Sequence, residues 1–175
     1  MIRLVPELTC HVAAREALLD ASFGAARFAK ASERLREGRL PAEGLSFAAL
    51  EGRRLVGTVR LWHVVAGPCR PALLLGPLAV DEAWRGKGLG GRLMTMALGE
   101  AALLGHRAVL LVGDPAYSER FGFSSHHTGE LRLPGPYERH RLLGLELARD
   151  SLAGAAGLVG PAGAVDLVER VRRAA

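Results

Sequence analysis

The stretch from Leu75 to Arg92 constrains the fold more than any other part of this chain. An apolar segment ends at Val80, and a glycine-rich basic turn, Gly86-Lys87-Gly88-Leu89-Gly90-Gly91, follows a few residues later and opens a run with helical spacing. Glycines permit a tight turn and close approach of a ligand, and the first turn of a helix leaves amide groups unpaired at its positive end. The stretch therefore predicts a strand, a turn and a helix that together bind a phosphate group, most simply that of a pyrophosphate.

Length and composition predict one ordinary domain over residues 1–175, with 151–175 as a C-terminal extension. The net charge is +5, but the basic residues are scattered with few aromatic residues between them, which does not favour nucleic-acid binding. No apolar run approaches the roughly 20 residues of a membrane span, and the first residues show no signal peptide, so we expect a cytoplasmic protein. Cys10 and Cys69 lie far apart, so neither a disulfide nor a metal site is expected.

Hydrophobic periodicity predicts an α+β fold around a mixed sheet. The expected strands cover residues 2–5, 45–50, 55–64, 72–80, 108–112 and 142–147. The expected helices cover residues 9–20, 25–37, 89–104 and 115–122, with a further helix at the end of the chain. The second and third strands form a hairpin, and the helix between 72–80 and 108–112 makes those two buried strands parallel.

The glycine turn also matches the pattern G-x-G-x-x-G of dinucleotide-binding proteins, and Asp114 ends the following strand, where a ribose-binding acid would lie. In that fold, however, the first glycine follows its strand almost directly, whereas residues 81–85 intervene here. Too little chain follows the turn for the remaining strands and helices. Binding of NAD(P) is therefore the less favoured alternative.

A different register of the same turn, Arg85-x-x-Gly88-x-Gly90 after Leu78-Ala79-Val80, resembles the acyl-CoA-binding signature of the GNAT superfamily of N-acetyltransferases. The later segment from Gly113-Asp114-Pro115-Ala116-Tyr117 to Phe121-Gly122-Phe123 resembles a bacterial GNAT branch of predicted acetyltransferases. The resemblance extends to about residue 165. It implies the α+β acyl-CoA N-acyltransferase fold, with a mixed central sheet of about six to seven strands flanked by helices.

The resemblance further implies direct transfer of an acetyl group from acetyl-CoA to a primary amine, with a small molecule as acceptor and no metal. The oligomeric state is left open, and a homodimer is possible. The residues that it implies for cofactor binding are Leu78, Ala79, Val80, Arg85, Gly86, Lys87, Gly88, Leu89, Gly90, Gly91, Asp114, Tyr117 and Ser118. An amide near Leu78 would polarise the thioester carbonyl. Asp114 could instead serve only as a helix cap. Lys87 or Arg92 could likewise be a solvated surface charge that does not contact the phosphates.

The catalytic groups depart from the family pattern. In many GNAT enzymes a tyrosine protonates the leaving thiolate, and this chain has Ser118 at that position. Tyr117 comes directly before Ser118, and the side chains of two neighbouring residues on a helix point about 100° apart. Both are candidates for contacts on the thiol side. The strand before Leu78 has no ionisable group, so His63 is the candidate general base, with His126, His127 or a water relay as weaker alternatives.

These departures leave open a non-catalytic, acyl-CoA-binding module. The early helices and the loops near residues 125–140 are expected to form the acceptor pocket, with Phe23, Phe28 and Glu33 as candidates for its lining. The sequence does not identify the acceptor.

Overall fold

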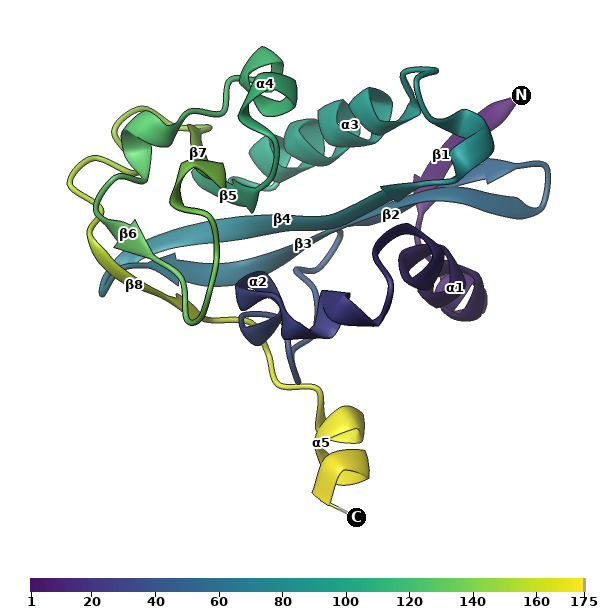
Figure 1. Cartoon of the computed structure of the whole chain (residues 1–175), viewed down its shortest axis with the longest axis horizontal. Helices are drawn as coiled ribbons and strands as arrows, with labels where there is room; N and C mark the ends of the chain where they lie inside the picture. Colours follow the sequence, from purple (N-terminus) through teal and green to yellow (C-terminus); the bar gives the residue numbers. More distant parts are fainter. Residues whose placement is uncertain (175) are drawn as a thin grey trace.

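The computed structural model describes residues 1–174, and their side chains as far as residue 172. Its centre is a twisted mixed sheet (Figure 1). The main strand order is β1-β2-β3-β4-β5-β7, with β8 attached to β3 and β6 attached to β8. The strands are β1 (Ile2–Pro6), β2 (Ser46–Glu51), β3 (Arg54–Ala66), β4 (Arg70–Val80), β5 (Ala108–Val112), β6 (Leu131–Arg132), β7 (Leu142–Glu146) and β8 (Gly157–Pro161).

Helices cover both faces of this sheet (Figure 1). They are α1 (Val12–Phe23), α2 (Ala31–Arg34), α3 (Leu89–Leu103), α4 (Pro115–Ser118) and α5 (Leu167–Ala174), with short 3₁₀ turns between them. The predicted α+β class and the mixed sheet are thus confirmed, as is the hairpin of β2 and β3. The terminal helix is also present, and it projects away from the body of the molecule (Figure 1).

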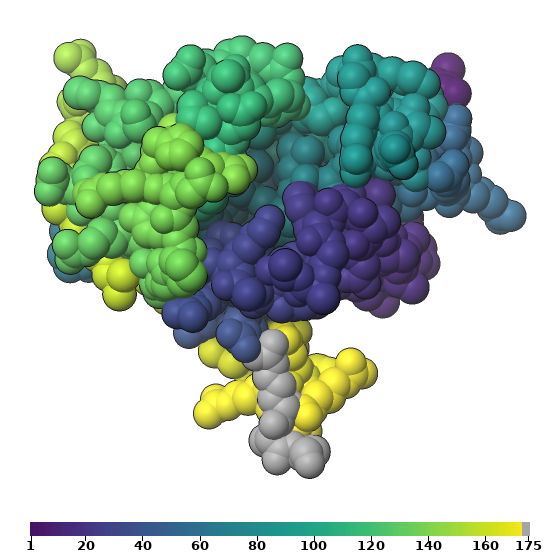
Figure 2. Space-filling model, viewed as in Figure 1, coloured from purple at the N-terminus to yellow at the C-terminus, as the bar shows by residue number. Residues whose placement is uncertain are grey.

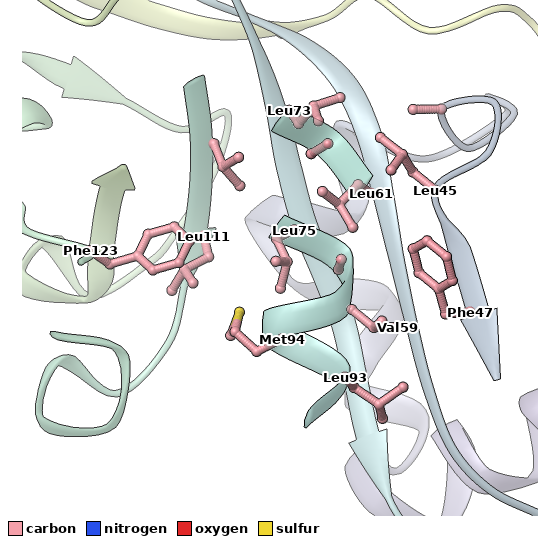
Figure 3. Close-up of a cluster of buried hydrophobic side chains, with 14 of the residues drawn as sticks. Leu45, Phe47, Val59, Leu61, Leu73, Leu75, Leu93, Met94, Leu111 and Phe123 are labelled. Atoms are coloured by element: carbon pink, nitrogen blue, oxygen red, sulfur yellow. The ribbon is translucent and has the colours of Figure 1, made fainter. Parts of the chain in front are cut away.

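One core lies between the sheet and α3. The apolar face of α3 presents Leu93 and Met94 to the leucines and valines of β3 and β4, and Figure 3 shows these side chains meeting in one cluster. Phe123, which is 1% exposed, closes the cluster beyond β5. A second cluster lies on the opposite face, where Leu35 packs with Trp62 and Leu74. Burial on both faces explains why β4 is almost wholly apolar.

Strands β4 and β5 are parallel, as predicted, but they pair over only two residues each. The register joins Leu73 to Val109 and Leu74 to Leu110, while β4 continues as far as Val80. Next to this point β4 is irregular, because its register with β3 shifts between the Leu61 and Val59 pairs. The two central strands therefore separate beyond Leu74, and this separation positions the site described below.

One expectation about the elements was wrong, and two strands, β6 and β8, were not expected. The expected helix over residues 25–37 is two pieces, a 3₁₀ helix over Ala25–Ala29 and the single turn of α2, because Lys30 between them has an extended backbone. The break lets Ala31 turn into the core below β3 and β4. The glycine- and alanine-rich segment after residue 151 contains a strand, β8, which pairs with β3 at Val64–Ala66. Sheet pairing there prevails over the weak strand propensity of its residues.

Candidate functional site

The glycine turn begins just beyond the end of β4. The carboxylate of Asp81 accepts a hydrogen bond from the amide of Ala83 at 3.0 Å and caps a short 3₁₀ turn, which places the glycines after it. Gly88 is the residue before α3, with a left-handed backbone at φ +78° that disfavours any side chain. No atom lies within 4 Å of the position that a Cβ would take at Gly86 or Gly88, so the turn faces open space.

Five backbone amides of this turn are free to bind a ligand. In the part of the chain that the structure describes, the amides of Gly86 and residues 88–91 donate no hydrogen bond to backbone or side chain. They lie at the positive end of a 15-residue helix. Unpaired amides at such an end are a site for phosphate oxygens, so the residues present fit a pyrophosphate.

A cavity of about 620 Å³ lies over this turn, and we call it the glycine-turn cavity. Most of the residues expected to bind the cofactor line it: Leu78, Ala79, Val80, Arg85, Gly86, Gly88, Leu89, Gly90, Gly91 and Tyr117. Lys87 does not line it; its ammonium lies 5.1 Å from the centre of the Trp84 ring. Arg92 is also turned away and donates to the carbonyl of Ile2.

A second cavity of about 660 Å³ opens where β4 and β5 separate, and we call it the strand-gap cavity. Its floor is formed by residues 74–78 of β4 and by residues 111–114, at the end of β5 and just after it. Its outer walls are formed by the α2 segment and the loop 133–141. Figure 2 shows this face hollowed between the early helices and the chain around residues 110–140. The two cavities share Phe23, Leu78 and Tyr117, so they meet at the gap between the strands.

Tyr117 and Ser118 are neighbours on α4, but their side chains lie in different parts of the site. The hydroxyl of Tyr117 lies over the first turn of α3, beside Gly90, and Tyr117 lines both cavities. Ser118 is 2% exposed and lines only the strand-gap cavity. The angular separation expected on a helix thus assigns Tyr117 to the junction of the cavities and Ser118 to the strand gap.

Asp114 lines the strand-gap cavity and also caps α4, since its carboxylate accepts a hydrogen bond from the amide of Ala116 at 3.0 Å. His63 lies elsewhere. It is on β3 with its ring 5.4 Å from that of His106, and it lines neither cavity. The structure does not bring His63 to the other site residues, so we remove it from the candidate site. His127 likewise lies beside Glu146, at 3.8 Å.

Phe23 and Glu33 line the strand-gap cavity as expected, whereas Phe28 does not; it is 58% exposed beneath the guanidinium of Arg27. Sequence analysis missed the basic residues of this cavity, above all Lys30, Arg36 and Arg141. No local pattern in the sequence marks them, because only the fold brings residues 30–36 and residue 141 to one cavity.

Comparison with known proteins identifies the family. Residues 13–123 match the Acetyltransferase (GNAT) family. The chain belongs to this family. As a GNAT protein it is an acetyl-CoA-dependent N-acetyltransferase. It is 38% identical to the uncharacterized N-acetyltransferase YhbS of Escherichia coli K12, over 82% of this chain and 86% of that protein.

Solved structures agree with this assignment. The crystal structure of Escherichia coli YhbS in complex with CoA superposes with a TM-score of 0.75 and 34% identity, covering 93% of this GNAT chain and 89% of that one. A GNAT acetyltransferase from Brucella melitensis in complex with acetyl-CoA has a TM-score of 0.69 at 22% identity, covering 93% and 96%, and supports the fold alone. Among the described residues, no helix is long and apolar enough to cross a membrane, and no group of three or more His, Cys, Asp or Glu side chains could hold a metal ion.

Proposed function

We propose that this GNAT protein transfers the acetyl group of acetyl-CoA directly to the primary amine of a small acceptor in the strand-gap cavity. One observation carries the proposal, namely that the glycine-turn and strand-gap cavities meet at Leu78 and Tyr117. A cofactor whose phosphates lie on the glycine turn can extend past Leu78 and reach the second cavity. The acceptor enters that cavity from the side of α2 and the loop 133–141.

The free amides at the start of α3 would bind the pyrophosphate, with Arg85 at the rim of the cavity. Residues 78–80 of β4 line the same cavity and would run beside the pantetheine arm. Bound acetyl-CoA supplies an activated acetyl group and a thiol leaving group. The structure of the Escherichia coli relative in complex with CoA supports CoA binding by this chain.

The acceptor must present a neutral amine, and the strand-gap cavity favours that form. Lys30, an alkyl ammonium in the cavity lining, shows the effect: partial burial first, and then the charges of Arg141 and Arg36, lower its pKa, although part of its side chain is exposed. An acceptor ammonium in the same space meets the same cations. The cavity therefore favours deprotonation of the acceptor amine. Neither Glu33 nor Asp114 is free to act as the base, because Arg36 engages Glu33 at 2.9 Å and Asp114 caps its helix.

Ser118, a buried residue in the lining of the strand-gap cavity, is the candidate for a contact with the leaving thiol. Its hydroxyl is a weak acid, but a thiol with a pKa of about 8.5 leaves readily near neutral pH, and a hydrogen bond from Ser118 would stabilise it. Cys10 and Cys69 are exposed and line neither cavity, which supports direct transfer over a cysteine-bound acetyl group.

The test is calorimetric titration of acetyl-CoA into the wild-type protein and two glycine variants. Gly88→Glu places a negative charge at the glycine turn, and we expect it to raise the Kd for acetyl-CoA at least about tenfold by repelling the phosphates. Gly105→Glu is the matched control, because it has the same left-handed backbone (φ +83°) and open surroundings at the other end of α3. Equal affinity of Gly88→Glu and wild type would refute the proposed cofactor site. Binding of NADPH in place of acetyl-CoA would revive the dinucleotide alternative.

A further inference from the structure

We propose that the strand-gap cavity selects acceptors whose amine is accompanied by an anionic group, a carboxylate or a phosphate, held by Lys30, Arg36 and Arg141. The inference rests on the proposed function and names the chemical class of its acceptor. It is carried by three cations that come from two separate segments and line one cavity.

The three side chains reach the cavity from opposite walls. Lys30 lies at the break before α2, Arg36 follows α2, and Arg141 precedes β7. The two walls approach closely, since a Cβ at Gly135 would lie 2.9 Å from a guanidinium nitrogen of Arg34. The arrangement therefore gathers positive charge around a space enclosed by both segments, in the hollow visible in Figure 2.

Three carboxylates also line the cavity, those of Glu33, Asp114 and Glu138, but none of them pairs with Lys30, and Asp114 accepts from the amide of Ala116. Arg36 is 9% exposed and has one carboxylate partner, Glu33. Arg141 donates to the carbonyl of Gly113 at 3.2 Å, and its guanidinium is 3.8 Å from Glu138, a side chain that is 65% exposed. A solvated carboxylate at that distance compensates a guanidinium only weakly.

Lys30 has no acidic partner within ion-pair distance among the residues that the structure describes. Its ammonium lies 4.8 Å from the centre of the Phe23 ring, at the junction of the two cavities. Arg27, which also lines the strand-gap cavity, differs because Glu16 at 2.6 Å and Asp20 at 3.0 Å hold it. The uncompensated charge is thus on Lys30 and Arg141, and an anion between the walls would supply the missing partner.

The position of the cations also separates this site from that of the cofactor phosphates. Lys30, Arg36 and Arg141 line the strand-gap cavity and not the glycine-turn cavity. A guanidinium nitrogen of Arg36 lies 3.7 Å from the point that a Cβ on Gly76 would occupy, so this cation reaches the edge of the strand gap. An acceptor whose anion is bound between the walls can direct its amine toward Leu78 and Ser118.

The experiment compares matched amines by thiol release from acetyl-CoA. The pairs are β-alanine with propylamine and phosphoethanolamine with ethanolamine, which differ chiefly in the anionic group. We expect kcat/KM to be at least about tenfold higher for the anionic member of one or both pairs, as for a charge-assisted hydrogen bond. The carboxylate and phosphate arms show which anion the site prefers.

The variants Arg141→Gln and Lys30→Gln should lower kcat/KM for the anionic amine about tenfold or more, leaving the Kd for acetyl-CoA unchanged. Arg139→Gln is the matched control: Arg139 lies on the same turn as Arg141, donates to the carbonyl of Gly129 and does not line the cavity. Because Lys30 is exposed, its variant remains informative if Arg141→Gln lowers the melting temperature.

The proposal is overturned if neutral amines react as well as their anionic partners, or if no anionic amine reacts. It is also overturned if either variant weakens acetyl-CoA binding as much as it weakens acceptor turnover, because the cations would then serve the cofactor. The titration of Gly88→Glu reports on the cofactor site independently. Failure here with an intact cofactor site would therefore refute the anion site and leave the acetyltransferase proposal standing.

Discussion

The hydroxyl of Tyr117 lies 3.0 Å from the point that a Cβ on Gly90 would occupy. The guanidinium of Arg120 lies over the ring of Tyr117, 4.0 Å from its centre. Gly90 is in the first turn of α3, among the amides that would bind the cofactor phosphates. The missing side chain at Gly90 thus makes room for a phenol at the junction of the two cavities.

Gly90→Ala should displace this phenol. Because the new methyl group and the hydroxyl cannot both keep their places, we expect the Kd for acetyl-CoA to rise about tenfold, equivalent to about 1.4 kcal/mol, in a calorimetric titration. Gly91→Ala is the control, since its methyl group would lie at an ordinary 3.6 Å from the Phe121 ring.

The double variant Gly90→Ala/Tyr117→Phe separates the two contributions. Removing the hydroxyl removes the clash, so affinity should return to that of Tyr117→Phe alone. Wild-type affinity in Gly90→Ala would show that the contact between these two residues has no bearing on the cofactor.

Trp62 stabilises the irregular part of β4 through a hydrogen bond. Its indole N–H donates to the carbonyl of Gly76 at 2.7 Å, in a buried setting next to the strand gap. Trp62→Phe leaves that carbonyl without its donor, so we expect the free energy of unfolding to fall by about 1–3 kcal/mol in urea denaturation, together with a lower kcat. Trp84→Phe should cost less, because the hydrogen bond that the Trp84 indole N–H donates to Glu51, at 3.4 Å, is exposed. Equal stability of Trp62→Phe and wild type would contradict this role.

The parts of the fold that follow local rules could be predicted from the sequence. The glycine turn, the apolar strand before it and the helix after it depend on residues within one continuous segment, and the structure has all three. The hairpin of β2 and β3 is similarly local. Parallel pairing of β4 and β5 followed from the handed crossover that α3 provides.

The outer wall of the site could not be predicted, because it depends on contacts between distant residues. Lys30 reaches the strand gap only because the chain breaks before α2, and Arg141 because β7 pairs with β5. His63 was favoured for its intrinsic pKa, which carries no information about position; in the fold it lies beside His106. Strand β8 was missed because its glycines have weak strand propensity and its partner, β3, is about a hundred residues earlier.

Glu7 joins α1 to the sheet. Its side chain, 4% exposed, accepts hydrogen bonds from Arg15 of α1 and from Arg60 of β3. Glu7→Gln leaves Arg60 without its charged partner and Arg15 with Glu16 as its remaining carboxylate, so we expect unfolding to become easier by about 3 kcal/mol in urea denaturation. Asp20→Asn is the control, because Asp20 also binds an arginine of this region, Arg27, but is 61% exposed; its cost should stay below about 1 kcal/mol. Equal losses in the two variants would rule out a special role of the buried carboxylate.

His106 provides a pH test of the position assigned to His63. Burial first, and the charge of His63 second, hold the pKa of His106 below its usual value. Below about pH 6.5 the unfolded chain therefore binds more protons at this residue than the folded chain, and stability falls as the pH is lowered through this range.

His63→Gln removes the second cause, so the pKa of His106 should rise toward its usual value yet remain below it, because burial persists. The loss of stability at acid pH should become smaller accordingly. Turnover should be unchanged, since His63 lines neither cavity. A proton NMR titration of the histidine rings and a pH profile of kcat check both expectations. A hundredfold fall in kcat with loss of its pH dependence near neutrality would instead return His63 to the reaction as the general base.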